Sequence, residues 1–330
     1  MTHNKENSFE SSKDLFEKEA ALFVQNEEAA NPVAVETVEP QPTSLGKANM
    51  ILEREKESEV LAGEIGWKNV PIEHLPSQGM FYPIGTQIAI RAASVAEIRH
   101  WSTIDENDLL GVDDMLNFIL EKCCRIKMPN QPSTYKDIKE IDRFYLIFAV
   151  RDFTFKNGEN KLVVTVTDAD GISEKIEVTK DVIDYFNPDE RLMKYHNQER
   201  GCFTMEMKTG EVFDLYMPTV GSMMFIKNYI KAKRQSNQNL DKAFIKYAPF
   251  LFSEWRTMTA ASYDKAIQDS LSWSLSRISV LDKMVEILSS SVDPKIRYTT
   301  SSGTEATAEL NFPGRFKSIF LISDIFGELV

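Results

Sequence analysis

The sequence is poor in the residues that disulfide-rich, membrane-spanning and nucleic-acid-binding proteins require. Three cysteines among 330 residues exclude a disulfide framework, so we expect a cytosolic protein. No apolar run approaches the roughly 18 to 20 residues that cross a bilayer, and the polar start is not typical of a secretion signal. Lys and Arg number 38 against 50 Asp and Glu, a net charge of −12, which argues against a nucleic-acid partner.

Signatures of catalysis and cofactor binding are also missing. No glycine-rich phosphate loop and no Gly-x-Ser-x-Gly turn occurs, and the four histidines are isolated. We therefore predict a protein that is not an enzyme and that holds no cofactor and no metal. A hard-cation site remains the alternative for one acidic cluster, although such residues more often form an exposed loop and a helix N-terminus. That cluster comprises Asp105, Glu106, Asp108, Asp113 and Asp114.

Two other groups have structural interpretations that we prefer to functional ones. Cys123 and Cys124 lie in an apolar stretch, which favours buried thiols over metal ligands. The sequence Asp168-Ala-Asp-Gly lacks the remaining ligands of a calcium loop, and it is typical of a hairpin turn.

Composition and periodicity divide the chain into four regions. Residues 1–64 hold 6 Lys/Arg against 14 Asp/Glu, and we predict a disordered acidic arm; a docking peptide that folds on a partner is the alternative. Residues 65–155 are predicted as a β-turn plus helical domain, 156–218 as an antiparallel β-hairpin module and 219–330 as a helical C-terminal region. The expected fold class is α+β, with helical modules flanking a small, mostly antiparallel β module.

Local patterns predict the individual elements. Capping-box spacing at Ser94 and Thr134 indicates two helix starts. Helices are predicted by capping, apolar runs or a 3.6-residue period over 94–101, 115–126, 134–148, 220–233, 240–247, 249–257 and 262–290. Strands are predicted by alternation over 87–92, 161–167, 172–178, 203–207, 212–217, 295–299 and 307–312.

One segment carries a resemblance to a known family. Leu75-Pro-Ser-Gln-Gly-Met-Phe-Tyr-Pro-Ile-Gly-Thr, followed by a short strand and the helix from Ser94, resembles the opening of the baseplate hub assembly proteins of T-even-type contractile-tailed phages. The segment Tyr135–Phe155, with Asp142, is similar to the continuation of that family. The resemblance covers about residues 70–155. The chain departs from the family at 203–213, where relatives carry a Cys-x-x-Cys pair and this sequence has none, so no structural zinc is carried over.

The resemblance implies a non-enzymatic assembly factor, a chaperone that binds a baseplate hub or tape-measure component in the host cytoplasm. A permanent structural component of the virion baseplate is one alternative, and a metal-dependent enzyme is another. No nucleic-acid or membrane partner is expected. An apolar groove would receive an amphipathic helix of the partner; the same side chains forming the domain core is the other interpretation. The candidate groove residues are Phe81, Tyr82, Trp101, Leu116, Ile119 and Leu120.

Overall fold

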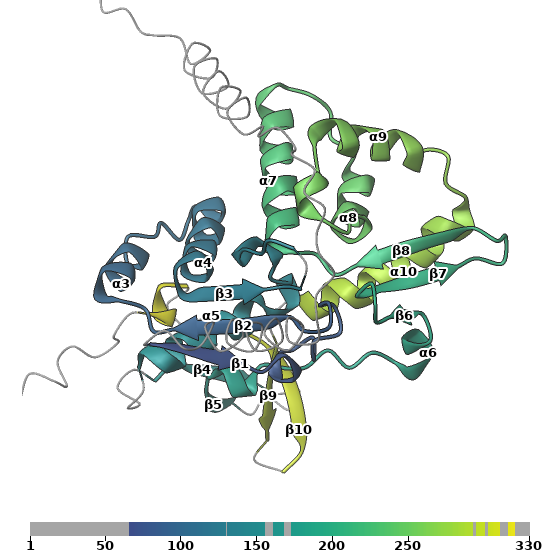
Figure 1. Cartoon of the computed structure of the whole chain (residues 1–330). Helices are drawn as coiled ribbons and strands as arrows, with labels where there is room; N and C mark the ends of the chain where they lie inside the picture. Colours follow the sequence, from purple (N-terminus) through teal and green to yellow (C-terminus); the bar gives the residue numbers. More distant parts are fainter. Residues whose placement is uncertain are drawn as a thin grey trace, which may run out of the picture. The chain divides into compact units, whose positions relative to one another are not determined.

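A three-stranded antiparallel sheet and one buried helix organise the chain (Figure 1). The sheet has the order β1 (Trp67–Val70), β2 (Gln87–Arg91), β3 (Cys124–Lys127), and α5 (Glu140–Thr154) lies against β2. Nearly every side chain of α5 from Glu140 to Arg151 is buried. A helix that is enclosed on all sides is central to its domain, so α5 is the element around which the others pack.

The computed structural model describes residues 66–129, 131–155, 161–167, 173–292, 295–300, 303–310 and 316–320. These residues belong to one compact unit. The predicted acidic arm, residues 1–64, lies outside the described residues. No helix in the described ranges is long and apolar enough to cross a membrane.

The two predicted capping boxes are confirmed, but one opens a different element. Ser94 caps α3 (Val95–Trp101), whereas Thr134 caps a 3-10 turn, η2 (Tyr135–Asp137), and α5 begins only at Glu140. The turn closes early because Ile138 is extended and buried.

The predicted helix over 115–126 is misplaced at both ends. The helix, α4 (Leu109–Cys123), starts after its cap Asp108 and stops at Cys123. Residues from Cys124 form β3 instead, because Cys124 and Ile126 alternate inward and pair with β2.

Both predicted central hairpins are confirmed. β4 (Val163–Thr167) pairs with β5 (Ser173–Glu177), and the turn residues 168–172 lie outside the described residues. β7 (Cys202–Glu206) pairs with β8 (Val212–Tyr216), and a short third strand, β6 (His196–Asn197), joins β7.

The C-terminal helices differ from the prediction in two places. α7 (Val220–Gln235) is as expected, but α8 (Lys242–Leu251) runs through the proline at which a new helix was predicted. The long helix predicted over 262–290 is wrong, because the chain turns between α9 (Ala260–Ser270) and α10 (Leu275–Val292). Leu271 and Leu275 are 72% and 84% exposed, so only the later part of the apolar stripe is buried.

Short elements complete the described chain. The predicted strands near the C-terminus are present as the hairpin β9–β10, although the second begins two residues earlier than expected. The remaining elements are η1 (Ile72–His74), η3 (Lys180–Val182), α6 (Glu190–Met193), η4 (Trp255–Thr257), β9 (Lys295–Thr299), β10 (Glu305–Glu309) and η5 (Phe316–Ile319).

Three apolar cores lie in the described part of the chain, and two of them join regions that the sequence predicted as separate modules. The first lies on the β1–β2–β3 sheet and α5, and it includes contacts from β4, β9 and Phe320, whose ring lies 5.3 Å from that of Trp101. The second lies between the β7–β8 hairpin and helices α8 and α10. The third is an aromatic cluster around Tyr263 within α7–α9. The fold class is α+β.

Candidate functional site

The turn Leu75–Thr86, which carries the family resemblance, is built around a left-handed backbone. Gln78 and Gly79 have φ of +52° and +78°, and a Cβ on Gly79 would lie 2.3 Å from Cγ2 of Ile72. Only glycine fits such a position without strain. The turn docks on a distant segment, since the Phe186 amide donates to the Pro76 carbonyl at 2.8 Å.

Beneath the turn lies a buried polar junction with α5. The Ser77 amide and hydroxyl both donate to the Asp142 carboxylate at 2.8 Å. The Tyr82 hydroxyl also hydrogen-bonds Asp142 and accepts from the Lys139 amide at 3.0 Å. Ser77 and Tyr82 therefore face one carboxylate 60 or more residues further along the chain, which gives the motif and Asp142 a common structural role.

Burial dominates the electrostatics of this junction. Burial raises the pKa of Asp142 to about 6, although the hydrogen bonds from Ser77 and Tyr82 favour the carboxylate and lower it. Burial lowers the pKa of Lys139 to about 8, although the negative charges of Asp137 and Asp142 favour the protonated amine and raise it. Both groups are held in the interior at a cost to their charged forms. The Asp142 carboxylate joins the turn to α5 through its bonds with Ser77.

The six predicted groove residues all lie in the interior. Each is at most 4% exposed, in agreement with the interpretation that they form the core and not an open groove. The reason is the orientation of two elements. Helix α4 packs against η2 and α5, which buries Leu116, Ile119 and Leu120. The turn directs the rings of Phe81 and Tyr82 into the interior. The residues are Phe81, Tyr82, Trp101, Leu116, Ile119 and Leu120.

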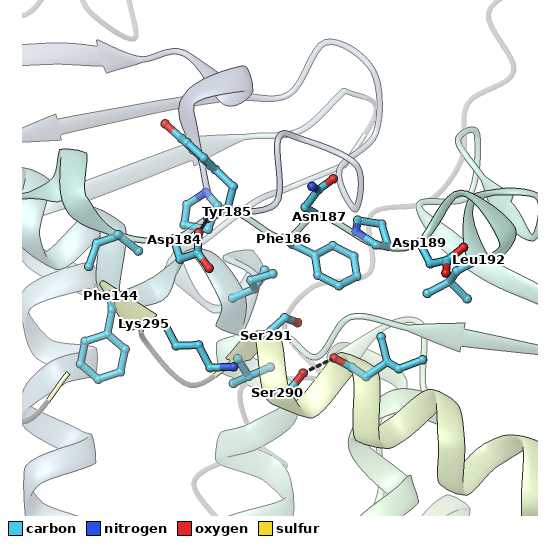
Figure 2. A pocket seen from close by; sticks show the side chains of 16 residues that line it. Phe144, Asp184, Tyr185, Phe186, Asn187, Asp189, Leu192, Ser290, Ser291 and Lys295 are labelled. Carbon is cyan, nitrogen blue, oxygen red and sulfur yellow. Dashed lines mark hydrogen bonds between the residues drawn. The ribbon is translucent and has the colours of Figure 1, made fainter. Parts of the chain in front are cut away.

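An open groove does exist beside the turn, in a place that the sequence did not indicate (Figure 2). Its volume is about 310 Å³, and its lining comes from α5, from the segment 183–189, from α6 and from the C-terminal end of α10. Figure 2 labels Phe144, Phe186 and Leu192 among the apolar side chains of the lining. Most of the lining is apolar: Pro76, Ile141, Phe144, Ile183, Phe186, Pro188, Leu192, Ile287 and Val292.

The polar groups of this groove are mostly engaged with the protein itself. Asp184 lies 3.4 Å from the Arg297 guanidinium, and the hydrogen bonds of Arg191 lower the pKa of Asp189 to about 2. The hydroxyls of Ser290 and Ser291 donate to carbonyls of their own helix. What the groove offers a ligand is therefore an apolar surface with a charged rim, and the rim includes the amine of Lys295.

Three residues of the acidic cluster, Asp108, Asp113 and Asp114, cap α4 or form ion pairs. Asp108 accepts from the Leu110 amide as the helix cap. Asp113 pairs with Arg143 at 2.6 Å and with Lys227 at 3.0 Å, and Asp114 also pairs with Lys227. Among the described residues no group of three or more His, Cys, Asp or Glu side chains could hold a metal ion.

The cysteines are buried thiols within the described chain. Cys123, Cys124 and Cys202 are free and buried, as the sequence predicted for the adjacent pair. Burial raises the pKa of each thiol, and that of Cys123 reaches about 12.

Comparison of the chain with protein-family models, with curated proteins and with solved structures finds no match.

Proposed function

We propose that this chain is a non-enzymatic assembly factor of a contractile phage tail. In this proposal it binds a baseplate hub or tape-measure component while the tail is built in the host cytoplasm. Two features support the proposal: the resemblance of residues 70–155 to the hub assembly proteins, and the apolar groove beside the turn that carries the resemblance.

The groove is the observation that carries the binding part. It is open to solvent and about 310 Å³ in volume, and its walls are apolar side chains such as Phe186 and Ile287. A pocket of this kind receives one or two apolar side chains that project from a partner helix. Because most rim carboxylates and hydroxyls are already paired, affinity would come from apolar burial, at roughly 25 cal/mol per Å².

The experiment is co-purification of the chain from infected cells with the hub and tape-measure proteins of the same phage. Ser290 is an exposed position on the groove rim, so Ser290→Trp should fill the groove from a position outside the core. Lys283→Trp is the matched control, because Lys283 lies on the same helix, is 70% exposed and does not line the groove. We expect the wild type and Lys283→Trp to retain the partner and Ser290→Trp to lose it.

Quantitative mass spectrometry of finished virions and of early tail complexes distinguishes the two roles. Enrichment in the early complexes alone supports an assembly chaperone, and a fixed copy number in both makes the chain a permanent baseplate component. Absence from both rejects the phage-tail proposal. Equal retention by Ser290→Trp places the binding surface elsewhere.

A further inference from the structure

The strand β1 has one unpaired edge in the described part of the chain. It pairs only with β2, and none of its residues makes a backbone hydrogen bond outside that pairing among the described residues. Figure 1 shows β1 at the outer side of the sheet, with β2 between it and β3. Lys68 and Asn69 are exposed. An edge of this kind is a template on which another strand can pair.

A cavity of about 820 Å³ lies directly beside this edge, between β1 and α5. Lys68 is paired with Ile90, and alternation places Lys68 and Val70 on the same face of the sheet, toward the cavity. The floor is apolar, and Tyr145 and Phe153 of α5 form aromatic walls.

One polar group in the cavity wall has no protein partner among the described residues. Tyr145 is 4% exposed, and its hydroxyl has no hydrogen-bond partner among the described residues. The hydroxyl oxygen is not among the buried atoms without a partner and Tyr145 lines the cavity, so it can bond a polar group that enters.

The unpaired charge at the cavity is positive, although the chain as a whole carries −12. Asp152, the carboxylate of the lining, already accepts from the Lys180 amide at 2.9 Å and lies 3.5 Å from Arg151. Lys180 is paired with Asp181. Lys68 has no ion pair among the described residues, and His74 lies at the same cavity. This balance favours an acidic ligand.

We propose that β1 takes up an extended, acidic segment of a partner protein as a fourth strand of the sheet. Residues directly opposite each other on neighbouring strands share one face. The residue opposite Lys68 is therefore acidic, and the residue two positions away, opposite Val70, is apolar and enters the cavity. This site is separate from the groove at α10. The edge of β1 would bind an extended strand, whereas the groove would bind side chains of a helix.

The test uses the full chain and a fluorescein-labelled peptide, Thr-Glu-Thr-Phe-Thr-Glu-Thr, which offers the acidic-x-apolar pattern in both strand directions. Fluorescence anisotropy measures binding. We expect saturable binding and a loss of at least tenfold in Lys68→Glu, or about 1.4 kcal/mol. Lys122→Glu is the matched control, because it makes the same charge change at a half-exposed lysine on α4; it should bind as the wild type does.

Two further measurements separate strand addition from simple charge attraction. A peptide that is N-methylated at every amide has no backbone donor on either edge and cannot pair with a strand, so it should not bind. Hydrogen exchange of the amides in Trp67–Val70 should slow when the unmodified peptide is bound. Ser290→Trp, which fills the groove of the proposed function, should leave peptide binding unchanged, so the two proposals fail independently.

The proposal is overturned by any of three results. These are no saturable binding up to about 1 mM peptide, equal affinity of Lys68→Glu and the wild type, and equal binding of the N-methylated peptide.

Discussion

Replacing Asp142 by asparagine tests the buried junction directly, because asparagine keeps the shape and removes the titration. The new side chain would offer one acceptor oxygen where the carboxylate offers two, and its amide group would face a donor of Ser77. An unsatisfied buried donor costs about 1–3 kcal/mol. We expect D142N to be less stable than the wild type by about that amount at pH 7.5, where Asp142 is ionised and both of its oxygens accept.

The pH dependence of this difference has a definite sign. Asp142 has a pKa of about 6 in the folded chain against 3.8 for the ordinary side chain. The raised value means that its contribution to stability is fully present below pH 3.8 and is lost as the pH rises through 6. Between pH 5 and pH 7.5 this loss amounts to about 1.4 kcal/mol in the wild type. Because the asparagine does not titrate in this range, the stability of D142N relative to that of the wild type should rise by about this amount from pH 5 to pH 7.5.

The assay is urea unfolding of the full chain followed by tryptophan fluorescence, at pH 5 and at pH 7.5. Asp269→Asn serves as the control, because Asp269 is exposed and has no ion pair within the described residues. Its difference from the wild type should not change between the two pH values. If the D142N difference is also constant with pH, the carboxylate is not strained by burial and the reasoning is wrong.

Three other predictions follow from packing and burial. Gly79→Ala should lower stability by about 2 kcal/mol or more, because the new methyl would meet Ile72 at a left-handed position; a shift in midpoint below about 0.5 kcal/mol would contradict this. Leu288→Ala, in the core, should cost about 2–5 kcal/mol, whereas Leu275→Ala, 84% exposed, should change stability by less than about 0.5 kcal/mol; similar costs would show that α10 packs differently. Cys123, with a pKa of about 12, should resist iodoacetamide at pH 8 in the folded chain and react after denaturation, as mass spectrometry would show.

Local signals in the sequence predicted the elements whose boundaries are set locally. The capping box at Ser94 and the alternation in the two central hairpins are examples, because each depends on residues within a few positions. The end of α4 depends on a distant contact. The break after α9 was missed although its bonds are local, since the amides of Leu271, Ser272 and Trp273 donate to carbonyls three residues back. β3 is a strand because β2 lies beside it, and Leu271 is exposed because the chain turns there.

The candidate site was harder to predict from the sequence, because it also depends on contacts between distant segments. The motif from Leu75 to Thr86 was recognised, and so was Asp142, but their hydrogen bonds span 65 residues. Aromatic residues in the motif predicted a binding surface, whereas Phe81 and Tyr82 point inward. The groove combines α5, the segment 183–189 and α10, and no local pattern relates these segments. The isolated lysine in a short edge strand, Lys68, was the one available signal for the second proposed site.

The contact between Trp101 and Phe320 has a consequence for biosynthesis. The first core includes side chains from β1 and from the segment at 319–320, so the first of the described segments to be synthesised shares a core with one of the last. Contacts of such long sequence separation form slowly, and N-terminal intermediates expose apolar surface meanwhile. The nascent chain therefore waits, with the indole of Trp101 uncovered, until translation has passed residue 320. A ribosome stalled before that point would carry an incompletely folded chain that chaperones and proteases can recognise.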